Sequence, residues 1–397
     1  MNFIFISPNF PTIYSQFIKA LHDRGVTVLG IGDTPYDNLN SECKENLTEY
    51  CFCSDLGNLQ WMKNTVDYLK SKYGPISYLE SNNEFWLESD AKLREYADVI
   101  NGLRPADMEM IKYKSKMKAG FIKAGVKVSR HILVESLEQC EKFIEEVNYP
   151  VFAKPDNGVG AAATFKITNH DELVDFYYAK GDVLYIMEEY ISGFITSFDG
   201  ICDDNSNVVL AFNEIFPIPI AEVVRKHCDV YYYAKADFDE EFRKMGERVV
   251  KAFGIKKRCF HIEFFCLDQD KEGLGKKGDI IALETNMRSP GGNTPDLLCI
   301  ALDKSYYEVY ADVIVNNSTT INLNEKHYIA ISVSRRKDLQ YEKSDSEIIA
   351  EYSNEIKSFG TYPKEIAGAM GDKYFFARFD DVESALEFKD KVLKQGC

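Results

Sequence analysis

The first hundred residues alternate between short apolar runs and segments with helical spacing, and this alternation restricts the fold more than any other feature. Asn2–Ser7 is a short apolar run, Thr12–Arg24 carries apolar residues at helical spacing, and Val26–Ile31 is the next apolar run. This order predicts a β-α-β unit and therefore a parallel sheet. Further helices predicted over Leu59–Tyr73 and Asn83–Tyr96 complete a small doubly wound domain.

The turn after the first predicted strand, SPNFP, lacks the G-x-G-x-x-G pattern of dinucleotide-binding domains, which removes the main support for a dehydrogenase. In the later part of the chain, one long helix is predicted over Met108–Ala124. Strands are predicted over Pro150–Lys154, Cys259–Leu267 and Asp279–Glu284. We expect the residues after Asn317 to form a small α+β cap.

The bulk composition excludes several classes of protein. A chain of 397 residues suits two or three packed subdomains, and its net charge of −16 argues against a nucleic-acid partner. No apolar run reaches the ~20 residues that cross a bilayer, and the N-terminus does not resemble a signal peptide. The ten cysteines are scattered without a C-x-x-C pair, which indicates reduced thiols. We therefore expect a cytoplasmic protein without a nucleic-acid or membrane partner.

The most informative segment, His261–Gly292, contains H-I-E-F-F and, after a loop, L-E-T-N-M-R. Glu263 and Glu284 have apolar neighbours on both sides, so a carboxylate buried there needs a cation or a positive side chain. Strand alternation places Glu284, Asn286 and Arg288 on one face. Oxygen ligands from Glu263, Glu284 and Asn286, together with phosphates, suit Mg²⁺. The alternative is a structural ion pair between Glu284 and Arg288.

The segment Pro150–Ile167 joins an apolar strand ending in Lys154 to a loop with Gly158, Gly160 and three alanines. Such a loop has no bulky side chains, so its backbone N–H groups can approach phosphates closely while the lysine supplies positive charge. The alternative for the loop alone is a flexible hairpin. The lysine and the loop together indicate a phosphate-binding element.

Four blocks resemble, in order and spacing, the ATP-grasp superfamily, specifically its carboxylate–amine ligase and biotin-carboxylase-like branch. KSKMKAGFIKAGVKV and AKPDNGVG resemble the two phosphate-lysine blocks, IMEEYISG resembles the hinge that holds adenine, and the two strand motifs resemble the metal block. The resemblance covers roughly Asp107 to Asn317. The site residues that it implies are, for the nucleotide, Lys114, Lys154, Gly158, Gly160, Glu188, Glu189, Tyr190 and Ile191, and, for the metal, Glu263, Glu284 and Asn286.

The resemblance implies an α/β protein in which a doubly wound pre-ATP-grasp domain, residues 1–105, precedes a two-subdomain α+β ATP-grasp fold. The small subdomain with its glycine-rich flap would span 106–190, and the large subdomain with the metal site and the C-terminal cap would span 191–397. One position departs from the family pattern. Ile195 stands where many relatives have a glutamate that binds the ribose hydroxyls.

The activity that the resemblance implies is that of an ATP-dependent ligase using Mg²⁺, with Mn²⁺ as an alternative. A small-molecule carboxylate, for example an amino acid, becomes an acyl phosphate and is transferred to an amine. Arg288 is then the catalytic and substrate-binding residue, aided by N–H groups near Gly291. Two alternatives stay open: a bicarbonate-using carboxylase or carbamoyl-phosphate-type enzyme, and a non-catalytic ATP-binding regulatory module.

Three further expectations concern assembly and individual segments. A homodimer is expected because many relatives are homodimers. We interpret His261 as a structural residue. The lysine-rich loop QDKEGLGKKG, between the two metal strands, is interpreted as a solvated excursion.

Overall fold

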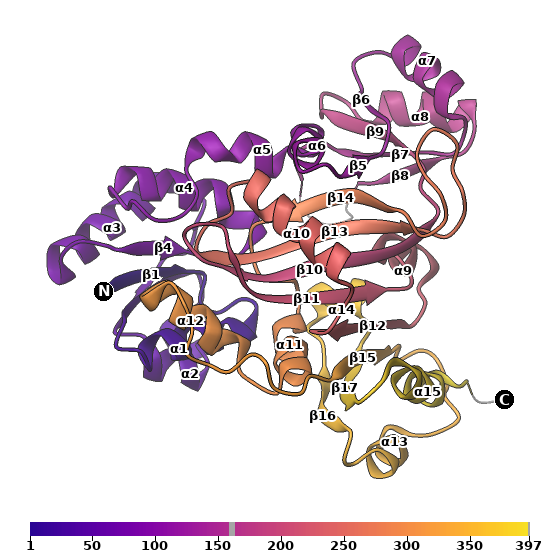
Figure 1. The fold of residues 1–397 in the computed structure, drawn as a ribbon. Helices are drawn as coiled ribbons and strands as arrows, with labels where there is room; N and C mark the ends of the chain where they lie inside the picture. Colours follow the sequence, from indigo (N-terminus) through magenta and orange to yellow (C-terminus); the bar gives the residue numbers. More distant parts are fainter. Residues whose placement is uncertain (159–162, 396–397) are drawn as a thin grey trace.

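Three β-sheets organise the chain, and the structure, a computed structural model, describes residues 1–158 and 163–395. A four-stranded sheet lies near the N-terminus, a nine-stranded sheet forms the centre, and a second four-stranded sheet follows from the middle of the sequence. In Figure 1 the N-terminal sheet lies at the left, the nine-stranded sheet crosses the middle, and the second small sheet lies at the upper right.

The N-terminal sheet is parallel throughout, as the alternation of strands and helices predicts. Phe3 and Phe5 belong to one core cluster and Ile4 and Ile6 to another, so both faces of the first strand are buried. In spatial order the strands are β3 (Glu49–Phe52), β2 (Thr27–Gly32), β1 (Asn2–Ile6) and β4 (Tyr78–Glu80). The accompanying helices are α1 (Ser15–His22), α2 (Ser41–Asn46), α3 (Leu59–Tyr73) and α4 (Leu87–Tyr96).

The nine-stranded sheet is antiparallel except where its last strand pairs in parallel. In spatial order its strands are β16 (Ile356–Thr361), β17 (Lys373–Phe379), β15 (Ile329–Arg335), β12 (Val230–Lys235), β11 (Val208–Phe216), β10 (Gly193–Cys202), β13 (Arg258–Leu267), β14 (Ile280–Asn286) and β5 (Lys127–Val128). Fully buried Phe198, Phe260 and Phe264 pack with Val249 and Val250 of α10 (Glu240–Ala252) in one cluster. The central strands of the sheet are therefore held in place by α10 and by their own packed side chains.

The second small sheet has the order β6-β9-β7-β8. Its strands are β6 (His131–Leu133), β9 (Tyr185–Glu189), β7 (Val151–Pro155) and β8 (Phe165–Ile167). Two helices, α7 (Leu137–Val147) and α8 (His170–Ala179), share its core through Cys140, Phe143 and Leu173. This sheet carries both the predicted second lysine and the predicted hinge.

The helix predicted over Met108–Ala124 is in fact two helices, α5 (Met108–Lys112) and α6 (Lys114–Lys123). Between them Tyr113 is extended and forms an isolated bridge with Asn157. The N–H of Lys114 donates to the Asp156 carbonyl over 2.9 Å instead of a helical partner. A contact distant in sequence therefore ends the first helix, and it brings the start of α6 to the end of β7.

The residues after Asn317 contain both strands and helices, and their strands β15, β16 and β17 continue the nine-stranded sheet, in which β15 pairs with β12. Six further helices among the described residues complete this half of the chain: α9 (Ile220–Lys226), α11 (Thr294–Leu302), α12 (Tyr306–Asn316), α13 (Asp345–Glu351), α14 (Lys364–Met370) and α15 (Val382–Leu393). No helix within the described residues is long and apolar enough to cross a membrane. The domain boundaries near residues 105 and 190 stay predictions.

Candidate active site

One cavity of about 520 Å³ lies between the second small sheet and the central strands of the large sheet, and it joins the segments that the sequence singles out. These segments are far apart along the chain, since they come from α6, β7, β9, β13 and β14. The predicted site residues that line it are Lys114, Lys154, Gly158, Glu188, Glu189, Tyr190, Ile191, Glu263, Glu284, Asn286 and Arg288. The two lysines and the three oxygen ligands therefore face one space.

Asp156 caps the N-terminus of α6 and so positions Lys114, the first residue of this helix. Its carboxylate accepts from the N–H of Ser115 at 2.8 Å and from the Ser115 hydroxyl at 2.9 Å. Lys114 Nζ donates to the Gly158 carbonyl at 3.0 Å and lies 3.8 Å from Glu284 Oε2. The first lysine therefore touches both the start of the glycine loop and the metal block. Gly160 lies outside the described residues.

Lys154 shares one buried carboxylate, that of Glu188, with Lys118, which is not among the predicted site residues. Glu188 Oε2 lies 2.8 Å from Lys154 Nζ, and Glu188 Oε1 lies 2.6 Å from Lys118 Nζ. The Ser129 hydroxyl also donates to Glu188, at 2.6 Å. Burial alone would raise the pKa of Glu188, but the charges of Lys118 and Lys154 outweigh it and hold the pKa well below its ordinary value. Two ammonium groups facing one carboxylate leave net positive charge at this wall.

The hinge segment is fixed from outside the cavity. The Glu189 side chain is fully buried and accepts from the Arg130 guanidinium at 2.6 and 3.1 Å and from the Arg130 backbone N–H at 2.8 Å. Lys271 Nζ lies 3.6 Å from the same carboxylate. Most of the loop that carries Lys271 is exposed, as expected, but Lys271 turns toward the predicted hinge and Leu274 is buried.

Glu263 and Glu284 stand directly opposite each other on the paired strands β13 and β14. Like charges in that position repel, so the pair fits a bound cation. Burial would raise the pKa of Glu263, but a hydrogen bond from His261, with the charges of His261 and Arg288, lowers it below its ordinary value. With Asn286 alongside, the pair offers the hard oxygen atoms that Mg²⁺ prefers.

The protein alone supplies too few carboxylates for a closed metal site. Within residues 1–158 and 163–395, no group of three His, Cys, Asp or Glu side chains is arranged to hold an ion. Two carboxylates and an amide instead suit an ion that also binds ligand oxygens such as phosphates. The donor set therefore fits a metal that enters together with a nucleotide.

Arg288 follows the metal strand and has a guanidinium available to a ligand. It lines the cavity and donates to the Ser289 carbonyl at 2.7 Å, and no Asp or Glu among the described residues lies within 4.0 Å of it. The preceding carbonyl, that of Met287, accepts from Arg258 at 2.6 and 2.9 Å, which fixes the backbone there. Gly291 does not line the cavity, although a Cβ built on it would lie 4.0 Å from the Arg288 guanidinium.

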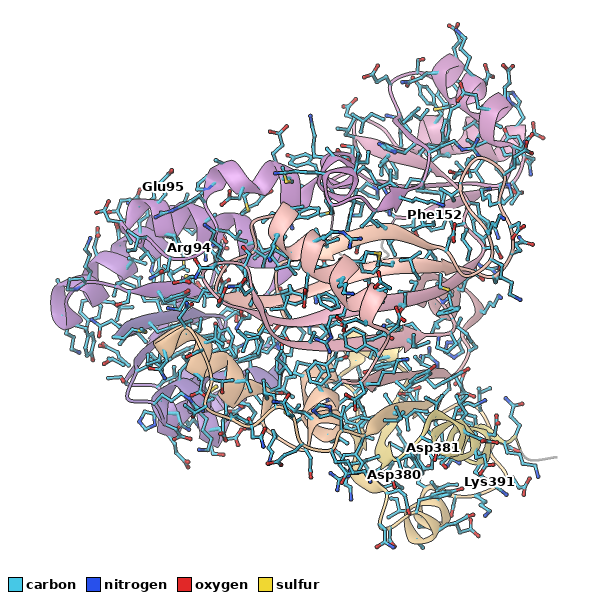
Figure 2. The ribbon with its side chains drawn as sticks, viewed as in Figure 1. Arg94, Glu95, Phe152, Asp380, Asp381 and Lys391 are labelled. Atoms are coloured by element: carbon cyan, nitrogen blue, oxygen red, sulfur yellow. The ribbon has the colours of Figure 1, made fainter. Side chains whose placement is uncertain are left out.

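Apolar residues form another part of the lining, and of these only Ile191 is a predicted site residue. Phe152, on the small sheet at the upper right of Figure 2, lines the cavity with Phe265, Leu283 and Ile191. Phe265 is two residues from Glu263 on one strand, so alternation places both on the same face. Likewise Lys118 is one helical turn after Lys114. Both signals were present in the spacing of the sequence.

Comparisons with known proteins identify the domain to which part of this cavity belongs. Residues 114–258 match the family model of the ATP-grasp domain. The chain is 26% identical over 140 residues to D-alanine–D-alanine ligase B of Clostridium perfringens, covering 33% of this chain and 46% of that protein. It is 25% identical over 223 residues to alanine–anticapsin ligase of Bacillus subtilis, covering 49% of this chain and 46% of that protein. The chain thus spans about half the length of the curated relatives it matches.

The likeness of fold extends beyond the matched domain. The solved structure of L-amino acid ligase from Bacillus licheniformis aligns with a TM-score of 0.73 at 15% identity, covering 100% of this chain and 99% of that one. The N-terminal parallel sheet and the C-terminal strands are therefore part of the shared architecture. Residues 114–258 of this chain form an ATP-grasp domain.

Proposed function

We propose that this chain is an ATP-dependent ligase that joins a carboxylate, in particular that of an amino acid, to an amine. One observation carries the proposal: Lys114, Lys154, Glu263, Glu284 and Arg288 line the same cavity although they lie far apart in sequence. The names of the curated relatives and of the neighbouring structure, which are ligases of alanine or of amino acids, favour an amide or peptide product.

The parts of the cavity suit different parts of ATP. Lys114 and Lys154 offer positive charge to the phosphates, and Gly158 lines the cavity beside them. The apolar lining from Phe152 and Phe265 suits a purine base, beside the hinge backbone at Glu189–Ile191. The divalent ion, Mg²⁺ or alternatively Mn²⁺, would be held by Glu263, Glu284 and Asn286, and when bound it neutralises phosphate charge.

The reaction then proceeds in two steps. A carboxylate oxygen attacks the γ-phosphorus, the bond from that phosphorus to the β–γ bridging oxygen breaks, and ADP leaves. The amine nitrogen next attacks the carbonyl carbon of the acyl phosphate, the C–O bond to phosphate breaks, and the amine loses a proton. Arg288, which has no carboxylate partner among the described residues, is placed to bind the anionic oxygen of the tetrahedral intermediate.

An assay of ADP release tests the proposal with the full chain, ATP and Mg²⁺. Each amino acid is supplied alone and in pairs, and bicarbonate with ammonia is supplied separately. Release that requires an amino acid and an amine supports the ligase. Release that requires bicarbonate instead would indicate a carboxylase or carbamoyl-phosphate-type enzyme. ATP binding without ADP release under any condition would indicate a regulatory module.

Two expectations about the whole protein remain proposals: that it acts as a homodimer, and that it works in the cytoplasm. Light scattering coupled to size-exclusion chromatography measures the first directly. A mass near twice the 45.4 kDa of the chain is the expected result. Fractionation of the source cells measures the second.

A further inference from the structure

A row of polar side chains lies behind Glu263 on the face of the large sheet that meets the cavity. His261 and Glu263 are two residues apart on β13, so their side chains share one face. On the neighbouring strand β10, Asp199 stands opposite His261 and Ser197 stands opposite Glu263. The row therefore runs from Glu263, at the cavity, to buried side chains on β13 and β10.

Hydrogen bonds connect this row from end to end. The Ser197 hydroxyl bonds one oxygen of the Asp199 carboxylate, and the other oxygen bonds His261 Nδ1. His261 Nε2 lies 3.1 Å from Glu263 Oε1. Ser197 and Asp199 are fully buried, and only 6% of His261 is exposed. The sequence alone does not reveal the contact between His261 and Asp199.

The direction of these bonds follows from the chemistry of the groups. An ionised carboxylate only accepts hydrogen bonds, so Nδ1 of His261 donates to Asp199 and Nε2 donates to Glu263. With both ring nitrogens held, the imidazole cannot turn. The bond to Glu263 uses Oε1 and leaves Oε2 available, and Glu263 still lines the cavity with 22% of its side chain exposed.

The surroundings show that this arrangement is costly for a position without a role. Glu214, on the next strand, is fully buried, and neither of its carboxyl oxygens has a hydrogen-bond partner among the described residues. Burial and then the charge of Asp199 raise the pKa of Glu214 well above its ordinary value, which disfavours the charged form of this carboxyl. The same interior buries Asp199 together with His261, where apolar residues of similar volume cost less.

We propose that His261 is a positioning residue that orients the Glu263 carboxylate toward the divalent ion, with Asp199 and Ser197 holding His261 in turn. The inference rests on the proposed function, because it assigns a role at the same metal site. Groups that orient a ligand to a metal in this way typically change metal affinity by about 10–100-fold when removed.

Binding of Mn²⁺ to the full chain in the presence of ADP, measured by the loss of the free-ion paramagnetic resonance signal, tests this role. His261→Ala is expected to weaken Mn²⁺ binding by about 10–100-fold. His261→Gln, whose amide can still donate to Glu263, is expected to lose less. ADP affinity measured in EDTA is expected to stay within about twofold for both, because His261 does not touch the nucleotide lysines.

His327 provides a matched control. Both of its ring nitrogens are also bonded, Nδ1 to Asp237 at 3.1 Å and Nε2 to the Leu323 carbonyl at 3.0 Å, but it does not line the cavity. His327→Ala is expected to bind Mn²⁺ as the unmodified protein does. Should His261→Ala not fold, as judged by circular dichroism, Asp199→Asn replaces it and is expected to weaken Mn²⁺ binding severalfold.

Two outcomes separate this inference from the proposed function. Folded variants of His261 or Asp199 that bind Mn²⁺ as tightly as the unmodified protein overturn the positioning role and leave the ligase proposal intact. An unmodified protein that binds neither ADP nor Mn²⁺ overturns the proposed function, and the inference falls with it.

Discussion

Glu188 is the residue on which the charge of the cavity most depends, because it separates two buried lysines. Its side chain and those of Lys118 and Lys154 are each less than a tenth exposed. Removing one partner of a buried ion pair leaves an uncompensated charge, which typically costs about 3–5 kcal/mol. We predict that Glu188→Gln lowers the free energy of unfolding by that amount. Urea unfolding at pH 7 measures it, with the exposed Glu145→Gln as the control that should change little.

The same carboxylate predicts a dependence of stability on pH. The pKa of Glu188 in the folded protein lies below its ordinary value of 4.5. Its contribution is therefore fully present above pH 4.5 and is lost as the pH falls toward the folded pKa. Between pH 7 and pH 4 the unmodified protein should lose more unfolding free energy than Glu188→Gln does. Parallel curves for the two proteins would contradict this assignment.

In the proposed reaction, Arg288 stabilises the negative charge of the tetrahedral intermediate. Removing one donor that stabilises an oxyanion typically costs about 10²–10³ in rate. We predict such a loss of turnover for Arg288→Ala. ATP affinity should be largely kept, because the proposed phosphate-binding residues are Lys114 and Lys154 and not Arg288. Arg288→Lys should recover only part of the rate, since an ammonium lacks the planar pair of donors. Unchanged turnover in Arg288→Ala would reject the role.

At the scale of elements, the paired strands β13 and β14 are shaped for a ligand rather than for stability alone. Glu263 and Glu284 face each other across the pair, and a cation between them relieves their repulsion. We predict that ADP with Mg²⁺ raises the melting temperature of the unmodified protein. Glu284→Gln should abolish the part of this rise that requires Mg²⁺. Asp279→Asn, at the start of the same hairpin and paired with Lys127 at 2.8 Å, should keep it.

Elements whose pattern is local could be predicted from the sequence. The helix over Leu59–Tyr73 and the strand over Cys259–Leu267 occur essentially where spacing places them, and alternation correctly puts Glu284 and Asn286 at one cavity. Features made by distant contacts could not be predicted in this way. Tyr113 breaks a continuous helical pattern only because it pairs with Asn157.

Two contacts that the sequence does not reveal have the same physical cause. The loop with Lys271 is rich in charge and mostly exposed, but Lys271 contacts Glu189, which is some eighty residues earlier in the sequence. His261 likewise forms a hydrogen bond with Asp199, which lies on a neighbouring strand and about sixty residues earlier in the sequence. Alternation alone shows that His261 shares a face with Glu263, whereas the register between β10 and β13 is a property of the folded sheet.

At the scale of the whole molecule, a buried ionic network joins the N-terminal sheet to β13, the strand that carries Glu263. Glu80, at the end of β4, lies 3.3 Å from Arg94 and 3.0 Å from Arg258, and all three side chains are at most 3% exposed. Arg94, labelled in Figure 2, belongs to α4, whereas Arg258 begins β13 and donates to the Met287 carbonyl, which precedes Arg288. The N-terminal sheet therefore supports the backbone of the active site.

We predict that Glu80→Gln costs about 3–5 kcal/mol of stability, because it leaves two buried guanidinium groups short of a carboxylate. Arg258→Met alone should cost a similar amount. The double variant should cost less than the sum of the two, since each change removes the partner of the other. Denaturant unfolding of the three variants measures this coupling, and strict additivity would contradict a shared network.

In the proposed reaction, one oxygen of the substrate carboxylate ends up in the released phosphate. In the predicted pathway an acid labelled with ¹⁸O in its carboxylate gives an acyl phosphate, and attack by the amine releases phosphate with one labelled oxygen. Once the ADP-release assay identifies an accepted pair of substrates, ³¹P resonance of the released phosphate measures the label. One ¹⁸O atom per amide bond formed is the predicted result. Unlabelled phosphate alongside the amide product would contradict the acyl-phosphate mechanism.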